Sequence, residues 1–152
     1  MDIRQHSSQF TVYVFTTDVD MGAPIKVALS QAGYDAFYFQ DPAMLESSLT
    51  ENPPHVLMFA THALYGTLTE FVELVRKIND DIRLIAIATT EQFEILAQYG
   101  SNGFSDVVID DKNSLDQRAL WSVDRVCEKL YLTYQNEQLF DDLQKAKAAE
   151  PV

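Results

Sequence analysis

The chain has 152 residues, of which 47% are hydrophobic and 22% charged, and this length and composition predict one soluble globular domain. Its formal net charge of −12 argues against binding to nucleic acid or to an anionic membrane surface. The single cysteine, Cys127, permits no intramolecular disulfide, and no apolar run approaches the roughly 18 to 20 residues that cross a bilayer, so we expect a cytoplasmic protein.

Five short apolar segments, rich in β-branched and aromatic residues, predict five strands. They are residues 10–15, 34–39, 55–60, 83–88 and 106–110. The third and fourth are almost continuously apolar, as strands covered on both faces must be. Amphipathic segments alternate with these strands over short connections. The pattern predicts a doubly wound, five-stranded parallel α/β sheet.

Local signals suggest where the helices begin and end. The first is expected over 24–33, with Pro24 in its first turn and Gly33 at its end. The segment 67–78 has a single apolar face. A further helix is expected to begin with Thr89 or Thr90 as the N-cap.

The ends of the predicted strands are where chemistry is expected, because parallel α/β sheets bind ligands outside the carboxyl ends of their strands. Here the first strand ends "VFTTDVD", the third "MFATHAL", the fourth "IAIATTE" and the fifth "VVIDDKN". The third strand therefore runs into Ala60 and Thr61 with no carboxylate.

The order, length and loop placement of residues 10–134 resemble the receiver domain of two-component response regulators. "YVFTTDVD" is similar to its first strand and acidic turn, "PPHVLMFATHALYG" to the stretch that holds the phosphoacceptor aspartate, and "GFSDVVIDD" to its fifth strand. The resemblance implies the sheet order 2-1-3-4-5 and a role in bacterial two-component signal transduction.

Carried over by this resemblance, the family's active-site positions fall on residues that lack its chemistry. The metal-binding acidic pair falls on Thr16 and Thr17, the phosphoacceptor on Ala60, the hydroxyl position on Ala88 or Thr89, the aromatic switch on Val107 and the lysine on Asp110. Phosphoryl transfer to a receiver needs a carboxylate nucleophile and Mg²⁺, which these residues do not supply. We therefore expect a non-catalytic pseudo-receiver with no catalytic residue, metal or cofactor.

Three alternatives remain open at this stage. A divalent cation could bridge Asp18 and Asp110, although Asp18 and Asp20 could instead cap the first helix. The emptied cleft could bind a small molecule; such a pocket would be lined by Thr16, Thr17, Ala60, His62 and Thr89. The chain could also be phosphorylated on another acid. His6, His55 and His62 have no metal-ligand spacing, and no nucleophile motif supports an enzyme.

The last predicted helix, from about Leu115 to Lys147, contains no glycine or proline and exceeds what a receiver needs. Its inner face is predicted to pack on the sheet through Ala119, Val123, Val126, Cys127, Leu130 and Tyr134. A second stripe comprises Trp121, Leu132, Leu139 and Leu143, with Phe140 on its flank. We expect this outer stripe to pair with a second copy as a parallel homodimer, although Gln135, Asn136 and Gln138 interrupt the heptads; the alternative is a tail that folds back or frays.

The expected organisation has three parts: a flexible terminus at 1–9, the pseudo-receiver at 10–134 and a helical linker at 135–152. Since receivers commonly precede an output domain, the linker is expected to lead to one. The resulting interpretation is a phosphorylation-independent signalling domain that acts by contact with an attached output domain or another signalling protein.

Overall fold

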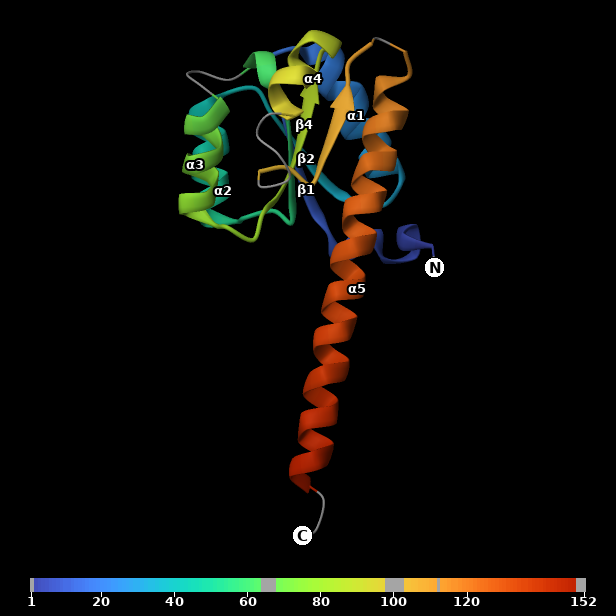
Figure 1. The fold of residues 1–152 in the computed structure, drawn as a ribbon. Coiled ribbons are helices and arrows are strands. Elements are labelled where there is room, and N and C mark those ends of the chain that lie inside the picture. Colours follow the sequence, from blue (N-terminus) through green and yellow to red (C-terminus); the bar gives the residue numbers. More distant parts are fainter. Residues whose placement is uncertain (1, 64–67, 98–102, 112, 150–152) are drawn as a thin grey trace.

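The computed structural model describes residues 2–63, 68–97, 103–111 and 113–149, and Figure 1 shows its fold. Five parallel strands form one sheet in the order β2-β1-β3-β4-β5. The strands are β1 (Thr11–Phe15), β2 (Asp35–Phe39), β3 (Val56–Ala60), β4 (Arg83–Ala88) and β5 (Asp106–Ile109). The predicted fold class and strand order are therefore confirmed.

Helices cover both faces of the sheet. They are α1 (Val19–Gln31), α2 (Pro42–Glu51), α3 (Leu68–Ile78), α4 (Thr90–Ala97) and α5 (Leu115–Ala149). Helices α1 and α5 lie side by side on one face, and α2 and α3 lie on the other (Figure 1). Every residue of β3 is buried, which explains the unbroken apolar run of this central strand.

Helix α1 begins earlier than its sequence suggests. Asp18 is the N-cap, and its carboxylate accepts a hydrogen bond from the Asp20 N–H at 3.0 Å. Pro24 therefore lies inside the helix, where the missing N–H leaves one carbonyl near the helix start without its partner. The predicted stop is confirmed: Gly33 has φ +96°, and the Tyr34 N–H bonds the Leu29 carbonyl at 3.1 Å, as in a Schellman motif.

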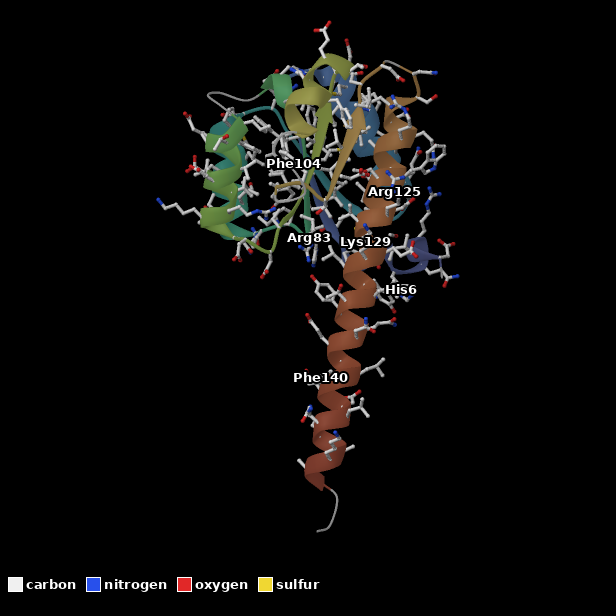
Figure 2. All side chains as sticks on the ribbon, in the orientation of Figure 1. His6, Arg83, Phe104, Arg125, Lys129 and Phe140 are labelled. Carbon is white, nitrogen blue, oxygen red and sulfur yellow. The ribbon has the colours of Figure 1, made fainter. Side chains whose placement is uncertain are left out.

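The amino-terminal segment differs from the flexible terminus expected for 1–9. Ile3–Gln9 form a 3₁₀ helix, η1, that buries Ile3 and Ser7. Arg4 pairs with Asp124 of α5 at 3.1 Å. The ring of His6 stacks on Tyr131 with 4.3 Å between centroids, and Figure 2 shows it beside α5. Burial of Ile3 and the contacts of Arg4 and His6 with α5 thus hold this segment against the domain. Its composition alone predicts a flexible terminus.

Helix α5 runs well beyond the domain, as its sequence predicts. Its first half packs against β5, α1 and η1, whereas its second half projects away from every other element (Figure 1). At 1.5 Å per residue, residues 132–149 add about 27 Å of helix. Among the described residues, no helix combines the length and apolar character that a membrane span requires.

Candidate functional site

The carboxyl edge of the sheet collects most of the residues singled out in the sequence. Thr16 and Thr17 follow β1, Ala60 ends β3, and Ala88 ends β4. Ala60 is paired in register with Ile87 of the neighbouring strand. Thr16 and Ala60 have no exposed surface, and Ala88 is only 3% exposed. The floor of this edge is therefore packed and neutral.

Thr16 is held by hydrogen bonds within the protein. Its Oγ1 accepts from the Asp18 N–H at 3.1 Å, and its carbonyl accepts from the Tyr38 hydroxyl at 2.9 Å. Gly22 of α1 leaves room for the Tyr38 ring, which lies where a Cβ would otherwise be. Tyr38 thus covers this end of β1, and the Asp18 carboxylate faces the start of α1.

A second network joins the end of β3 to the start of α4. The Thr61 hydroxyl donates to Gln92 Oε1 at 2.7 Å and lies 3.3 Å from the Ile87 carbonyl oxygen. Gln92 Oε1 also accepts from the Thr89 N–H at 3.1 Å, while Thr89 Oγ1 accepts from the Gln92 N–H at 3.4 Å. Thr89 and Gln92 therefore form a capping box, which identifies Thr89 as the N-cap. Thr61 fixes that box to the sheet without any charge.

The β5 side of the edge carries acidic groups with partners. Asp110 follows β5, and its N–H donates to the Ala88 carbonyl at 2.8 Å. Arg118 of α5 donates to the Ile109 carbonyl and to the Asp111 carboxylate. Val107, in the middle of β5, is partly buried and pairs with Ala86. A single arginine therefore ties the loop after β5 to α5.

The proposed cation bridge between Asp18 and Asp110 finds no support in this arrangement. Strands β1 and β5 are three places apart, or roughly 14 Å at 4.8 Å per strand. Asp18 is used as a helix cap. Within the part of the chain that the structure describes, no group of three or more His, Cys, Asp or Glu side chains is placed to hold a metal ion.

The three histidines do not converge on a site. His55 Nδ1 accepts from the Thr11 N–H at 3.0 Å, and burial lowers the pKa of this imidazole, so His55 is a neutral structural acceptor. His6 stacks on Tyr131, and His62 is exposed after β3.

A further cluster of side chains lies at the start of β5 and consists of Asp106, Ser122 and Arg125. Asp106 accepts from Ser122 Oγ at 2.7 Å and from Arg125 at 2.6 Å. Burial raises the pKa of the Asp106 carboxyl, but the hydrogen bonds from Ser122 and Arg125 outweigh it and hold the pKa below its ordinary value. Because Ser122 is fully buried, this cluster fixes α5 to the sheet.

The outer stripe of α5 is exposed. The exposed fractions are 50% for Trp121, 44% for Leu132, 60% for Leu139, 61% for Phe140 and 62% for Leu143. Figure 2 shows Phe140 on the part of α5 that has left the domain. The inner face is buried as predicted from Ala119 to Leu130, but Tyr134 is 47% exposed because the domain ends before it.

A groove lies between α2 and α3, and no pattern in the sequence predicted it. It has a volume of about 280 Å³ and an apolar lining that includes Phe15, Leu45 and Phe71, with Glu46 and Glu70 beside them. Leu74 of α3 also lines the groove and is partly exposed. The amphipathic pattern could not predict this exposure, because it marks the apolar face of α3 without showing how closely α2 approaches it.

Comparison with known proteins identifies the fold. No family model and no curated protein matches the chain, but solved structures do. NtrX from Brucella abortus in complex with ATP has a TM-score of 0.71 at 15% identity over 86% of this chain. The receiver (REC) domain of AraT, a response regulator from Geobacillus stearothermophilus, has 0.69 at 13% over 82%, and the BeF3-activated DrrB receiver domain has 0.64 at 17% over 78%.

These matches show that the chain has the receiver-domain fold. It spans 29% of the NtrX chain, but 98% of the AraT domain and 97% of the DrrB domain. The chain thus matches whole isolated receiver domains and less than a third of the longer protein.

Proposed function

We propose that this chain is a non-catalytic pseudo-receiver, a signalling domain that works without phosphorylation through contacts between proteins. The observation that carries the proposal is the carboxyl edge of the sheet. The residues there that correspond to the family's acids and lysine are Thr16, Thr17, Ala60 and Asp110. Ala60 offers no nucleophile, and an aspartate in the lysine's place repels a phosphoryl group.

The hydrogen bonds at this edge support a fixed conformation. A switchable receiver needs a group at the end of β4 that changes partner when the acceptor is modified. Here Thr89 is engaged in a capping box with Gln92, and Thr61 joins that box to β3. Neutral, mutually satisfied partners give α4 one favourable position, independent of any phosphate.

The outer stripe of α5 supports self-association as the mode of action. A helix already packed on its domain gains nothing from a second apolar face in water, yet Leu139 and Leu143 expose about three-fifths of their surfaces. Pairing these faces buries them. Helix α5 would then transmit the arrangement of two domains to an output domain that follows the helix, as expected if the chain is the receiver part of a longer protein such as NtrX.

A ligand-sensing role for the emptied cleft is less well supported. A pocket over Ala60 would need Thr16 and Ala60 to offer surface, and both are fully buried. Thr17, His62 and Thr89 are exposed, but they surround a packed floor.

The absence of phosphorylation is testable directly. Incubation of the chain with acetyl phosphate or beryllofluoride and Mg²⁺ is expected to leave the intact mass and the fluorescence of Trp121 unchanged. An active receiver domain treated in parallel is the positive control. A stoichiometric adduct on any acidic residue would overturn the proposal.

Self-association is tested separately by light scattering. The full chain is expected to have the mass of a dimer, and truncation after Tyr134 to give a monomer with an intact fold by circular dichroism. Replacing Leu139 and Leu143 by Glu should have the same effect, while Gln138→Glu with Gln144→Glu adds equal charge outside the stripe and should leave the dimer. A truncated chain that remains dimeric would refute the role of the tail.

A further inference from the structure

The tail of α5, residues 132–147, contains a heptad repeat although polar residues lie among its leucines. From the point where the helix leaves the domain, residues 132, 136, 139, 143 and 146 follow one another at spacings of four and three. These are alternating d and a positions of a heptad, occupied by Leu132, Asn136, Leu139, Leu143 and Ala146. Gln135 and Gln138 lie at g and c, outside the apolar seam. Asn136 is therefore the only polar residue within it.

We propose that residues 132–147 form a parallel, in-register, two-stranded coiled coil with a second copy of this chain, in which Asn136 faces Asn136 of the partner subunit. The inference rests on the self-association proposed above and adds the register of the two helices and the residues that fix their parallel orientation and their number. A single asparagine at an a position favours two strands in register, because the paired amides satisfy each other. In an antiparallel pair the same amide would face a leucine and lose its hydrogen bonds on burial.

Charge at the flanks agrees with the parallel register. Asp142 occupies a g position and Lys147 the e position five residues later. In a parallel dimer a g residue lies beside the following e residue of the other helix, so Asp142 meets Lys147 of the partner subunit, twice by symmetry. Phe140, at an e position, lies beside the seam and adds apolar cover.

The domain does not obstruct this pairing. Leu130, which is buried against the domain, and Leu139 are nine residues apart, or two and a half turns at 3.6 residues per turn. The seam therefore faces away from the domain, on the side where Trp121 is exposed five turns before Leu139. Two copies can therefore approach along their tails with both domains outside. The parallel register also places the two carboxyl-terminal ends of α5 together, so that segments following them would begin side by side.

Disulfide trapping tests the register in the full chain. Leu139→Cys at a d position is expected to form a covalent dimer under mild oxidation, since each residue 139 lies opposite its own counterpart. Asp141→Cys, at the outward f position, is the matched control and should not do so. Native Cys127 is fully buried and stays in both variants. If the chain is a dimer by light scattering but Leu139→Cys fails to cross-link, or Asp141→Cys cross-links equally well, the register is wrong although self-association holds. A monomeric chain would refute both.

Charge exchange tests orientation and partner choice. Asp142→Lys alone places lysine against lysine in both flanking pairs, and Lys147→Asp alone places aspartate against aspartate. Each homodimer should therefore have a higher dissociation constant than that of the unmodified chain. Mixed together, the two variants restore both attractive pairs and should form heterodimers well above the random proportion. A random mixture would overturn the parallel pairing. Asn136→Ile should raise the melting temperature of the tail and add species larger than dimers; an unchanged strict dimer would show that Asn136 does not set the stoichiometry.

Discussion

Replacement of Gly22 by alanine tests how the end of β1 is closed. In an exposed helix interior this change stabilises a protein by about 0.5–1 kcal/mol. Here a Cβ on Gly22 would lie 2.3 Å from Cε1 and 2.5 Å from Cζ of Tyr38, and 2.9 Å from Cγ2 of Thr16. The Tyr38 ring must move, and its 2.9 Å hydrogen bond to the Thr16 carbonyl is then lost.

The expected magnitude follows from three contributions. Overpacking costs about 1–3 kcal/mol, the lost hydrogen bond about 0.5–1.5 kcal/mol, and better helix propensity returns about 1 kcal/mol. Gly22→Ala should therefore lower the free energy of unfolding by about 0.5–3.5 kcal/mol. For a chain of this size that corresponds to a fall in melting temperature of roughly 1–14 °C.

Urea unfolding followed by circular dichroism measures the change. Gly103→Ala is the matched control, because among the residues that the structure describes a Cβ there would meet only Val72 Cγ1, at 4.0 Å, and its effect should be near zero or stabilising. In a Tyr38→Ala background the cost of Gly22→Ala should shrink to the residual contact with Thr16. A Gly22→Ala protein as stable as the parent, or an equal cost in both backgrounds, would refute the reasoning.

Three further outcomes are expected. Ser122→Ala removes a buried donor to Asp106 and should cost about 1–2 kcal/mol; because the pKa of Asp106 then rises, acid unfolding should begin at a higher pH, as pH-dependent urea curves would record. Burial raises the pKa of the Cys127 thiol from 9.0 to about 12, so iodoacetamide should label this thiol at pH 8 only on unfolding. The stability that the protonated thiol contributes should be lost as the pH rises from 9 through 12. Thr61→Val removes the donor to Gln92, so amide hydrogen exchange should be faster in α4 while exchange in the strands of the sheet stays unchanged.

The strands and the length of α5 were predictable because their signals are local. Central strands buried on both faces must be apolar throughout, and a helix without glycine or proline has no internal reason to stop. The expectation that Pro24 lies in the first turn of its helix misplaced the start of α1, because Asp18 caps the helix six residues earlier. Periodicity likewise assigned Tyr134 to the packed face, because it records the side of a helix but not where the domain ends.

The tertiary parts of the site could not be predicted. The capping box of Thr89 and Gln92 is a visible T-x-x-Q pattern, but its attachment to Thr61 depends on β3 and α4 meeting at one edge. Arg4 and Asp124 are 120 residues apart in the sequence, so η1 carries no signal of its contact with α5. Contacts of this kind follow from topology and appear only once the sheet order is known.

The proposed function places the response of the domain in α5. A conformational equilibrium shifts only when a ligand binds its two states with different affinities. At the sheet edge the polar groups of Thr16 and Thr61 are satisfied in one arrangement, and no acid follows β3 to accept a phosphoryl group. Pairing of two tails, in contrast, depends on protomer concentration by mass action. A domain of this kind would respond to whatever gathers its copies, with the sheet serving as a fixed support for the helix that does the pairing.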